Sequence, residues 1–138
     1  MTQAVSDRAY GRMVEVTVPF DEAVEKATAA LKEQGFGVLT TIAVDNVLRE
    51  KIGVERERYM ILGACNPNFA NKALDADIDI GLLLPCNVVV REEGDRRYVT
   101  FVDPRAMLAA AGSSAELEAI AAEVRGKLDA AAESLAAM

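Results

Sequence analysis

The chain has 138 residues, the usual length of one domain, which is enough to bury a hydrophobic core without disulfide bonds. Apolar residues make up 51% of it and charged residues 27%, a composition typical of soluble globular proteins. Its 22 acidic and 15 basic residues give a formal charge of −7, which repels nucleic-acid phosphates and anionic membrane surfaces. We therefore expect no nucleic-acid partner and no membrane partner.

The N-terminus lacks the apolar core of a signal peptide, and no stretch approaches the roughly 20 apolar residues of a spanning helix. The sequence therefore predicts a cytoplasmic protein. In a reducing compartment the two cysteines, Cys65 and Cys86, are expected to be free thiols rather than a structural disulfide.

The chain begins with a polar segment, residues 1–9, which we expect to be flexible. Residues 10–19 then alternate apolar and polar side chains, as a half-buried strand does. A helix is predicted next, because apolar residues recur at helical spacing. Asp21 is its expected N-cap, and Gly35 is expected to end it.

A second strand is predicted at residues 36–44, which are rich in Val, Thr and Ile. Asp45 can cap a short helix over residues 46–52, which would end at a glycine. Residues 58–64 form another apolar run and predict a third strand.

Asn66 followed by Pro67 is a cap and first-position pair, which predicts a helix beginning there. Residues 85–92 and 97–103 predict a β-hairpin around a Glu-Gly-Asp turn. Three consecutive valines, 88–90, make the first arm of this hairpin apolar on both faces, so we expect it to be central in the sheet.

The last part of the chain predicts a helical turn at residues 105–111, closed by Gly112, and then a long helix. Ser113 and Glu116 form a capping box at the start of that helix. An apolar stripe follows at helical spacing, as in an amphipathic helix. Its members are Leu117, Ile120, Ala121, Val124, Leu128, Ala131 and Leu135.

These elements together predict an α+β fold. We expect two layers, a largely antiparallel β-sheet with helices packed on one face, and a long C-terminal amphipathic helix, all in one domain over residues 10–138. Strands do not alternate regularly with long helices and glycine-rich turns, so a Rossmann fold is not expected.

The two cysteines are the main candidates for chemistry, because the chain has no histidine. Each is followed by an asparagine where an apolar run ends: Cys65 by Asn66, and Cys86 by Asn87. The start of the predicted helix would stabilise a Cys65 thiolate through its N–H groups and dipole. The simpler interpretation is that both thiols are small buried hydrophobes and that the asparagines cap a helix and close a turn.

Three chemistries would use the two thiols if their strand ends meet. A reversible disulfide requires Cα atoms within about 7 Å of each other. Two thiolates suit a soft monovalent metal ion such as Cu(I), with Met60 as a further sulfur. A reactive Cys65 would be a nucleophile and would need a base. The acidic residues considered for that role are Asp103, Glu55 and Glu57.

Several motifs, in order over roughly residues 10–107, resemble the bacterial and archaeal "domain of unknown function 302" family. They are Gly-Phe-Gly-Val-Leu-Thr at 35–40, the segment 59–67 ending in Gly-Ala-Cys-Asn-Pro, Ala-Leu at 73–74, and 80–90 with its Pro-Cys-Asn. The resemblance implies a small two-layer domain with an antiparallel sheet, usually met as a homodimer. It implies no activity.

We consider three functional hypotheses. In the preferred one, a homodimeric binding or sensing protein holds a small ligand or a soft metal ion at Cys65, Asn66, Cys86 and Asn87, with both cysteines as candidate metal ligands. The alternative is a thiol-dependent redox or nucleophilic enzyme with Cys65 as the catalytic residue. The third is a structural interaction module whose C-terminal stripe, 117–135, contacts another subunit.

Overall fold

A computed structural model describes residues 5–112 and 114–138. Its strands are β1 (Val5–Arg8), β2 (Gly11–Val16), β3 (Gly37–Ala43), β4 (Tyr59–Cys65), β5 (Cys86–Glu93) and β6 (Arg96–Val102). Its helices are α1 (Phe20–Glu33), α2 (Val44–Ile52), α3 (Pro67–Ala76), α4 (Pro104–Leu108) and α5 (Ala115–Ala136), with 3-10 turns η1 (Ile78–Leu83) and η2 (Ala109–Ala111).

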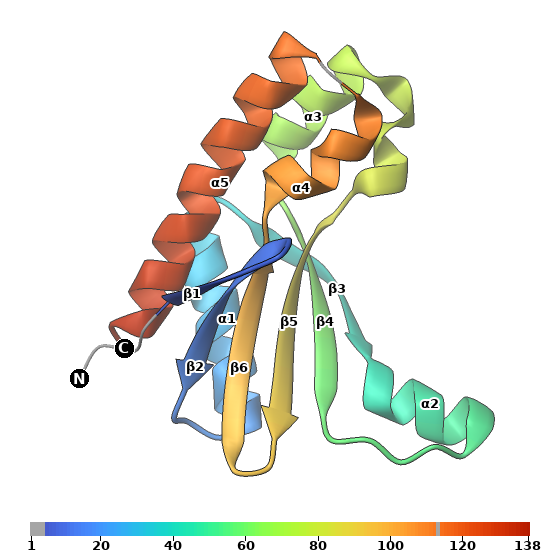
Figure 1. The fold of residues 1–138 in the computed structure, drawn as a ribbon, viewed down its shortest axis with the longest axis vertical. Helices are drawn as coiled ribbons and strands as arrows, with labels where there is room; N and C mark the ends of the chain where they lie inside the picture. Colours follow the sequence, from blue (N-terminus) through green and yellow to red (C-terminus); the bar gives the residue numbers. More distant parts are fainter. Residues whose placement is uncertain (1–4, 113) are drawn as a thin grey trace.

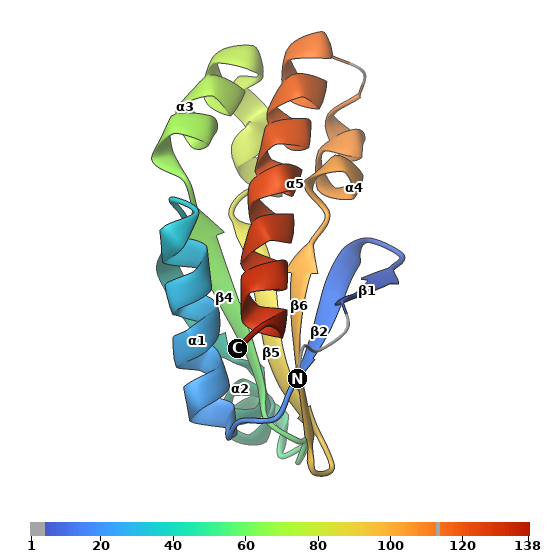
Figure 2. The same cartoon turned by 90° about the vertical axis from the view of Figure 1, so that its left-hand side faces the viewer.

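The six strands form one antiparallel sheet in the order β1-β2-β6-β5-β4-β3 (Figure 1). Helices α1 and α5 cover one of its faces, as Figure 2 shows. The predicted α+β class is therefore confirmed, and β5 is central in the sheet as expected. We call the face of the sheet that points away from α1 and α5 the open face.

The core lies between the sheet and these two helices. Val88 and Val90 of β5 and Val99 of β6 are fully buried there. The C-terminal part of the α5 stripe packs onto the same cluster, and its first part, at Leu117 and Ala121, packs onto a second cluster formed with α3, η1 and α4. Every member of the stripe is buried except Ile120, which is half-buried. The stripe therefore belongs to the chain's own core. The hypothesis that it contacts another subunit is wrong, because the sheet and the elements α3, η1 and α4 of the same chain already cover it.

Of the segment over residues 1–9 that was expected to be flexible, residues 5–8 form a strand. Val5–Arg8 pair with β2 as strand β1. Asp7 of this strand lies 3.0 Å from Nε of Arg12, whose Nη1 lies 3.2 Å from Asp129 of α5. Backbone pairing and these charges hold a strand that is too short and too polar to show an apolar pattern.

Two predicted helix caps are also wrong. Asp21 lies inside the first turn of α1, whose N-cap is Pro19, and its carboxylate is 2.9 Å from Arg58. Asp45 lies inside α2, where its buried carboxylate accepts a hydrogen bond from the Tyr59 N–H at 3.1 Å. Both side chains have partners outside their helices, so neither is free to cap.

Other predicted boundaries are confirmed. Gly35 follows α1 with a φ of +83°, a conformation that suits glycine. Gly112 likewise closes the turn before α5. The predicted capping-box residue Ser113 lies outside the described residues. The cap of α5 is Ser114, whose Oγ accepts a hydrogen bond from the Leu117 N–H at 3.4 Å.

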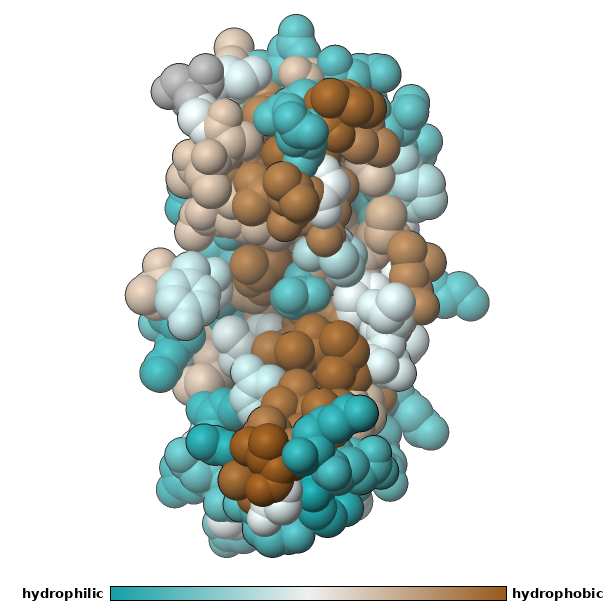
Figure 3. All heavy atoms as spheres, turned by 90° about the vertical axis from the view of Figure 1, so that its right-hand side faces the viewer, coloured by the Kyte–Doolittle hydropathy of each residue, from teal (hydrophilic) through white to brown (hydrophobic). Residues whose placement is uncertain are grey.

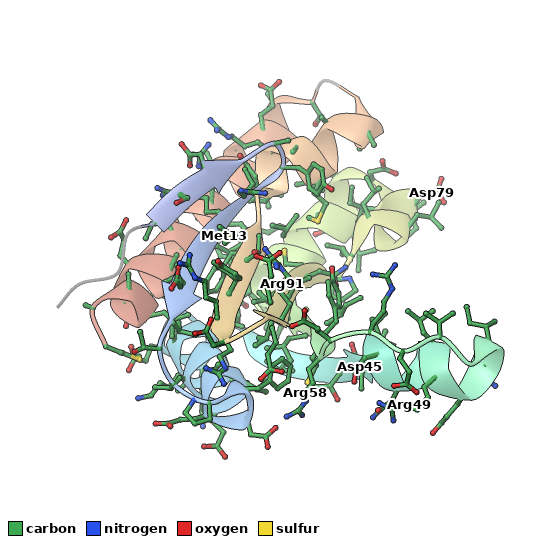
Figure 4. The ribbon with its side chains drawn as sticks, turned by 60° about the horizontal axis from the view of Figure 1, so that its bottom comes forward. Met13, Asp45, Arg49, Arg58, Asp79 and Arg91 are labelled. Carbon is green, nitrogen blue, oxygen red and sulfur yellow. The ribbon has the colours of Figure 1, made fainter. Side chains whose placement is uncertain are left out.

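Helix α2 and the loop after it stand away from the two layers (Figure 1), and we call residues 44–58 the arm. Within it, Asp45 and Arg49 lie next to each other (Figure 4), with 4.0 Å between Arg49 Nη2 and Asp45 Oδ2. Residues 49–58 are exposed throughout. The arm therefore contributes little to the core.

Replacing Leu128 with alanine tests the assignment of the α5 stripe to the core. Leu128 is 1% exposed, so the loss of its side chain should lower the free energy of unfolding by about 2–5 kcal/mol. The control is Leu82→Ala, at a leucine that is 87% exposed, which should change it by less than about 0.5 kcal/mol. Urea unfolding of both variants measures the difference. Equal effects would contradict the assignment.

Candidate functional site

Cys65 and Cys86 line the same cavity, at the end of the sheet where α3, α4 and α5 meet. Antiparallel pairing of β4 with β5 sets Ala64 opposite Cys86, and Cys65 is the next residue along β4. The cavity has a volume of about 30 Å³. Most of its wall is apolar and comes from Phe36, Phe69, Leu84, Pro85, Leu108 and Ile120.

Asn66 also borders this cavity, and it fixes the turn that follows Cys65. Its Oδ1 accepts hydrogen bonds from the N–H groups of Asn68 at 3.1 Å and Phe69 at 3.3 Å, so it caps α3 as predicted. The space beside it is tight, because a Cβ at Gly35 would lie 2.9 Å from Asn66 Nδ2. The cap therefore locks the chain directly after the cysteine.

Asn87 lies elsewhere. It is exposed and borders a hollow of about 530 Å³ on the open face of the sheet. In that hollow, Arg91 Nη2 donates a hydrogen bond to Met13 Sδ at 3.8 Å (Figure 4). Successive strand residues point to opposite faces, so Cys86 and Asn87 cannot share one side of β5. The four predicted site residues therefore divide, with Cys65, Asn66 and Cys86 together and Asn87 apart.

A third sulfur borders the cavity, and it is not the one considered from the sequence. Met60 does not line the cavity. It is paired with Val90 and packs against the main core. Met107 of α4 does line it. Pro104, Met107 and Leu108 all reach the cavity, which is the i, i+3, i+4 face of a helix. The Asp-Pro start of α4 was the only sequence signal that could have indicated this face.

The thiol of Cys86 is strongly affected by its surroundings. Its residue is 7% exposed, and burial, together with the nearby Cys65 thiol, raises its pKa from the ordinary 9.0 to about 11. Cys65 contributes to the raised pKa of Cys86 because the two thiolates would repel each other if both thiols ionised. Cys86 therefore keeps its proton at neutral pH unless a cation takes the place of that proton.

The acidic residues considered as bases all have other roles. Asp103 caps α4 by accepting a hydrogen bond from the Arg105 N–H at 2.9 Å. Glu57 accepts one from the Gly94 N–H at 2.7 Å, and Glu55 pairs with an arginine of the arm. Among the described residues that line the cavity, none is charged. In residues 5–112 and 114–138, no three histidine, cysteine, aspartate or glutamate residues form a cluster that could hold a metal ion.

The fold and the cavity define a small α+β domain with one antiparallel sheet and, at the end of that sheet, a mostly apolar cavity bordered by two cysteines and a methionine. Among the described residues, no helix has both the length and the apolar character needed to cross a bilayer.

The chain belongs to the DUF302 family, a domain of unknown function whose family model matches residues 13–135. The predicted family is confirmed. The chain is also similar to a solved structure, that of the uncharacterized conserved protein DUF302 from Bacillus stearothermophilus. The two share 29% sequence identity with a TM-score of 0.85, over 93% of this chain and 99% of the other. No curated protein matches the chain.

The raised pKa of Cys86 predicts a loss of stability at alkaline pH. The unfolded thiol ionises near pH 9 while the folded thiol keeps its proton to about pH 11, so stability falls as the pH rises through this window. The loss should reach about 3 kcal/mol relative to Cys86→Ala, which lacks the group. Urea unfolding across this window measures both proteins. Parallel pH profiles would contradict the predicted burial of the thiol.

Proposed function

We propose that the protein binds one soft monovalent metal ion such as Cu(I), between the sulfur atoms of Cys65, Cys86 and Met107, as a non-catalytic binding or sensing protein. The observation that carries this proposal is that three sulfur-bearing residues from β4, β5 and α4 line one cavity. Thiolate and thioether sulfurs favour Cu(I) over hard cations such as Mg²⁺ or Ca²⁺.

The size of the cavity favours an ion over an organic ligand. About 30 Å³ is roughly two to three times the 10–15 Å³ that a cavity needs to hold one water molecule. A single ion fits such a space, whereas a molecule of several heavy atoms would need the walls to move apart. The small-ligand hypothesis therefore narrows to an ion or a ligand of very few atoms.

Charge also favours a cation at this place. The described walls offer no charged side chain, so an ionised Cys86 would be a buried, unpaired anion. A bound Cu(I) would replace the two thiol protons and neutralise one of the two thiolate charges, which leaves the site with a net charge of −1. Metal uptake would then release protons, and affinity would rise with pH.

A second candidate function is a reversible Cys65–Cys86 disulfide. It is favoured by the position of the two cysteines at adjoining strand ends, where both line one cavity. Closing it would transfer two electrons and two protons to an external disulfide, which is reduced to two thiols. Cys65 would be the attacking group, because burial keeps Cys86 protonated.

We also propose that the protein is a homodimer and that it works in a reducing compartment such as the cytoplasm. Both the metal site and the disulfide switch require free thiols at rest, which a reducing compartment maintains.

Anaerobic titration with Cu(I) against a chromogenic chelator tests the metal site. The wild-type chain should bind one ion, and Cys65→Ala or Cys86→Ala should abolish this binding. Met107→Leu should weaken it at least about tenfold, or about 1.4 kcal/mol, because it removes one ligand. Met60→Leu is the matched control and should bind as the wild type does, because Met60 lies outside the cavity.

Equal losses in Met107→Leu and Met60→Leu, or no stoichiometric Cu(I) at all, would contradict the metal site. Rapid, reversible closure of a Cys65–Cys86 disulfide by a mild oxidant, without Cu(I) binding, would support the second candidate instead. Circular dichroism of each variant establishes that it is folded before its binding is compared.

A further inference from the structure

The sheet has two edge strands, and only one of them is protected against pairing with another chain. Strand β1 has four residues, two of which, Asp7 and Arg8, are charged. Strand β3 has seven residues, with neither a charged side chain nor a proline. Proteins usually protect an exposed edge with short length, charge or proline, because its free N–H and C=O groups can pair with a further strand.

The side chains of β3 are exposed as well as its edge. Leu39 is 69% exposed and Ile42 is 47% exposed, and the two threonines between them are also exposed. Within the part of the chain that the structure describes, β3 pairs with β4 alone. The one irregularity in this pairing lies between Val38 and Thr40, so the stretch from Thr40 to Ala43 is regular.

The arm continues this surface directly from β3. It carries exposed apolar side chains at Val47, Ile52 and Val54. Figure 3 looks onto this side of the molecule and shows apolar groups along its length, surrounded by hydrophilic ones towards the lower end. Because helix α2 has only nine residues, it gains little stability from its own hydrogen bonds.

Charge distinguishes the arm from the rest of the chain. It holds four acidic and four basic residues, so its net charge is zero, whereas the whole chain has a charge of −7. Two copies of the chain repel each other at long range. The surface of the arm is neutral and has positive and negative charges interspersed. Two copies can therefore approach each other at the arm, and its surface is complementary to its own copy. The eight residues are Asp45, Glu50, Glu55, Glu57, Arg49, Lys51, Arg56 and Arg58.

We propose that a second copy of the chain pairs its β3 antiparallel with the β3 of the first, about a two-fold axis. The two six-stranded sheets then become one continuous sheet, and each arm lies at the edge of the contact. Such an interface is isologous, so each strand supplies the donors and acceptors that the other lacks. The inference rests on the homodimer of the proposed function and names its surface.

Light scattering after gel filtration of the full chain tests this surface. The wild type should elute with twice the mass of one 14.8 kDa chain. Leu39→Lys/Ile42→Lys should elute as a monomer, because two lysines from each copy would meet at the contact. The matched control, Ser6→Lys/Leu82→Lys, adds the same charge at β1 and at another exposed leucine and should remain a dimer. Mixing Leu39→Lys/Ile42→Lys with Leu39→Glu/Ile42→Glu should restore the dimer through opposite charges.

Amide hydrogen exchange of the unmodified protein gives a second readout that does not depend on a variant folding. Amides of residues 38–42 should become more protected as the protein concentration rises, while those of β1 should not change. A dimer that persists in Leu39→Lys/Ile42→Lys would overturn the β3 interface and leave the proposed homodimer with another surface. A monomeric wild type would overturn both. Neither result bears on the sulfur site, which Cu(I) binding tests separately.

Discussion

The candidate site depends on the register of β4 against β5. Pairing Ala64 with Cys86 sets the two cysteines at adjoining strand ends, where they can share one cavity. A slip of one residue would turn Cys86 to the open face, where its neighbour Asn87 lies. The register is held by burial, because Leu62 and Val88 are paired with each other and both are completely covered by the core.

The helices complete what the strands begin. Helix α4 carries Met107 to the cavity, and its cap, Asp103, lies 3.4 Å from Arg125 of α5. Arg125 also lies 3.4 Å from Asp129, which contacts Arg12 of β2. This series of alternating charges connects the sulfur-bearing helix to α5 and to the sheet. The partly buried side chains of the series position the helix, and the apolar contacts of α5 supply most of the stability.

Periodicity and capping rules predicted the elements that depend on local sequence. The Asn66-Pro67 pair fixed the start of α3, and the spacing of apolar residues identified α5. Strand β1 was missed because its four residues are too few and too polar to show an apolar pattern, although its partner β2 follows directly in the chain. At the site, the meeting of the thiols was only a hypothesis, since the sequence does not give the β4–β5 register. Met107 was missed because the sequence does not show where α4 packs relative to the two cysteines.

The most direct test of the sulfur site is X-ray absorption at the copper edge, measured on anaerobic protein loaded with Cu(I). The convergence of Cys65, Cys86 and Met107 predicts a ligand shell of sulfur alone, which loses one sulfur in Met107→Leu and keeps all of them in Met60→Leu. Nitrogen or oxygen ligands, or a shell that Met107→Leu leaves unchanged, would contradict the account.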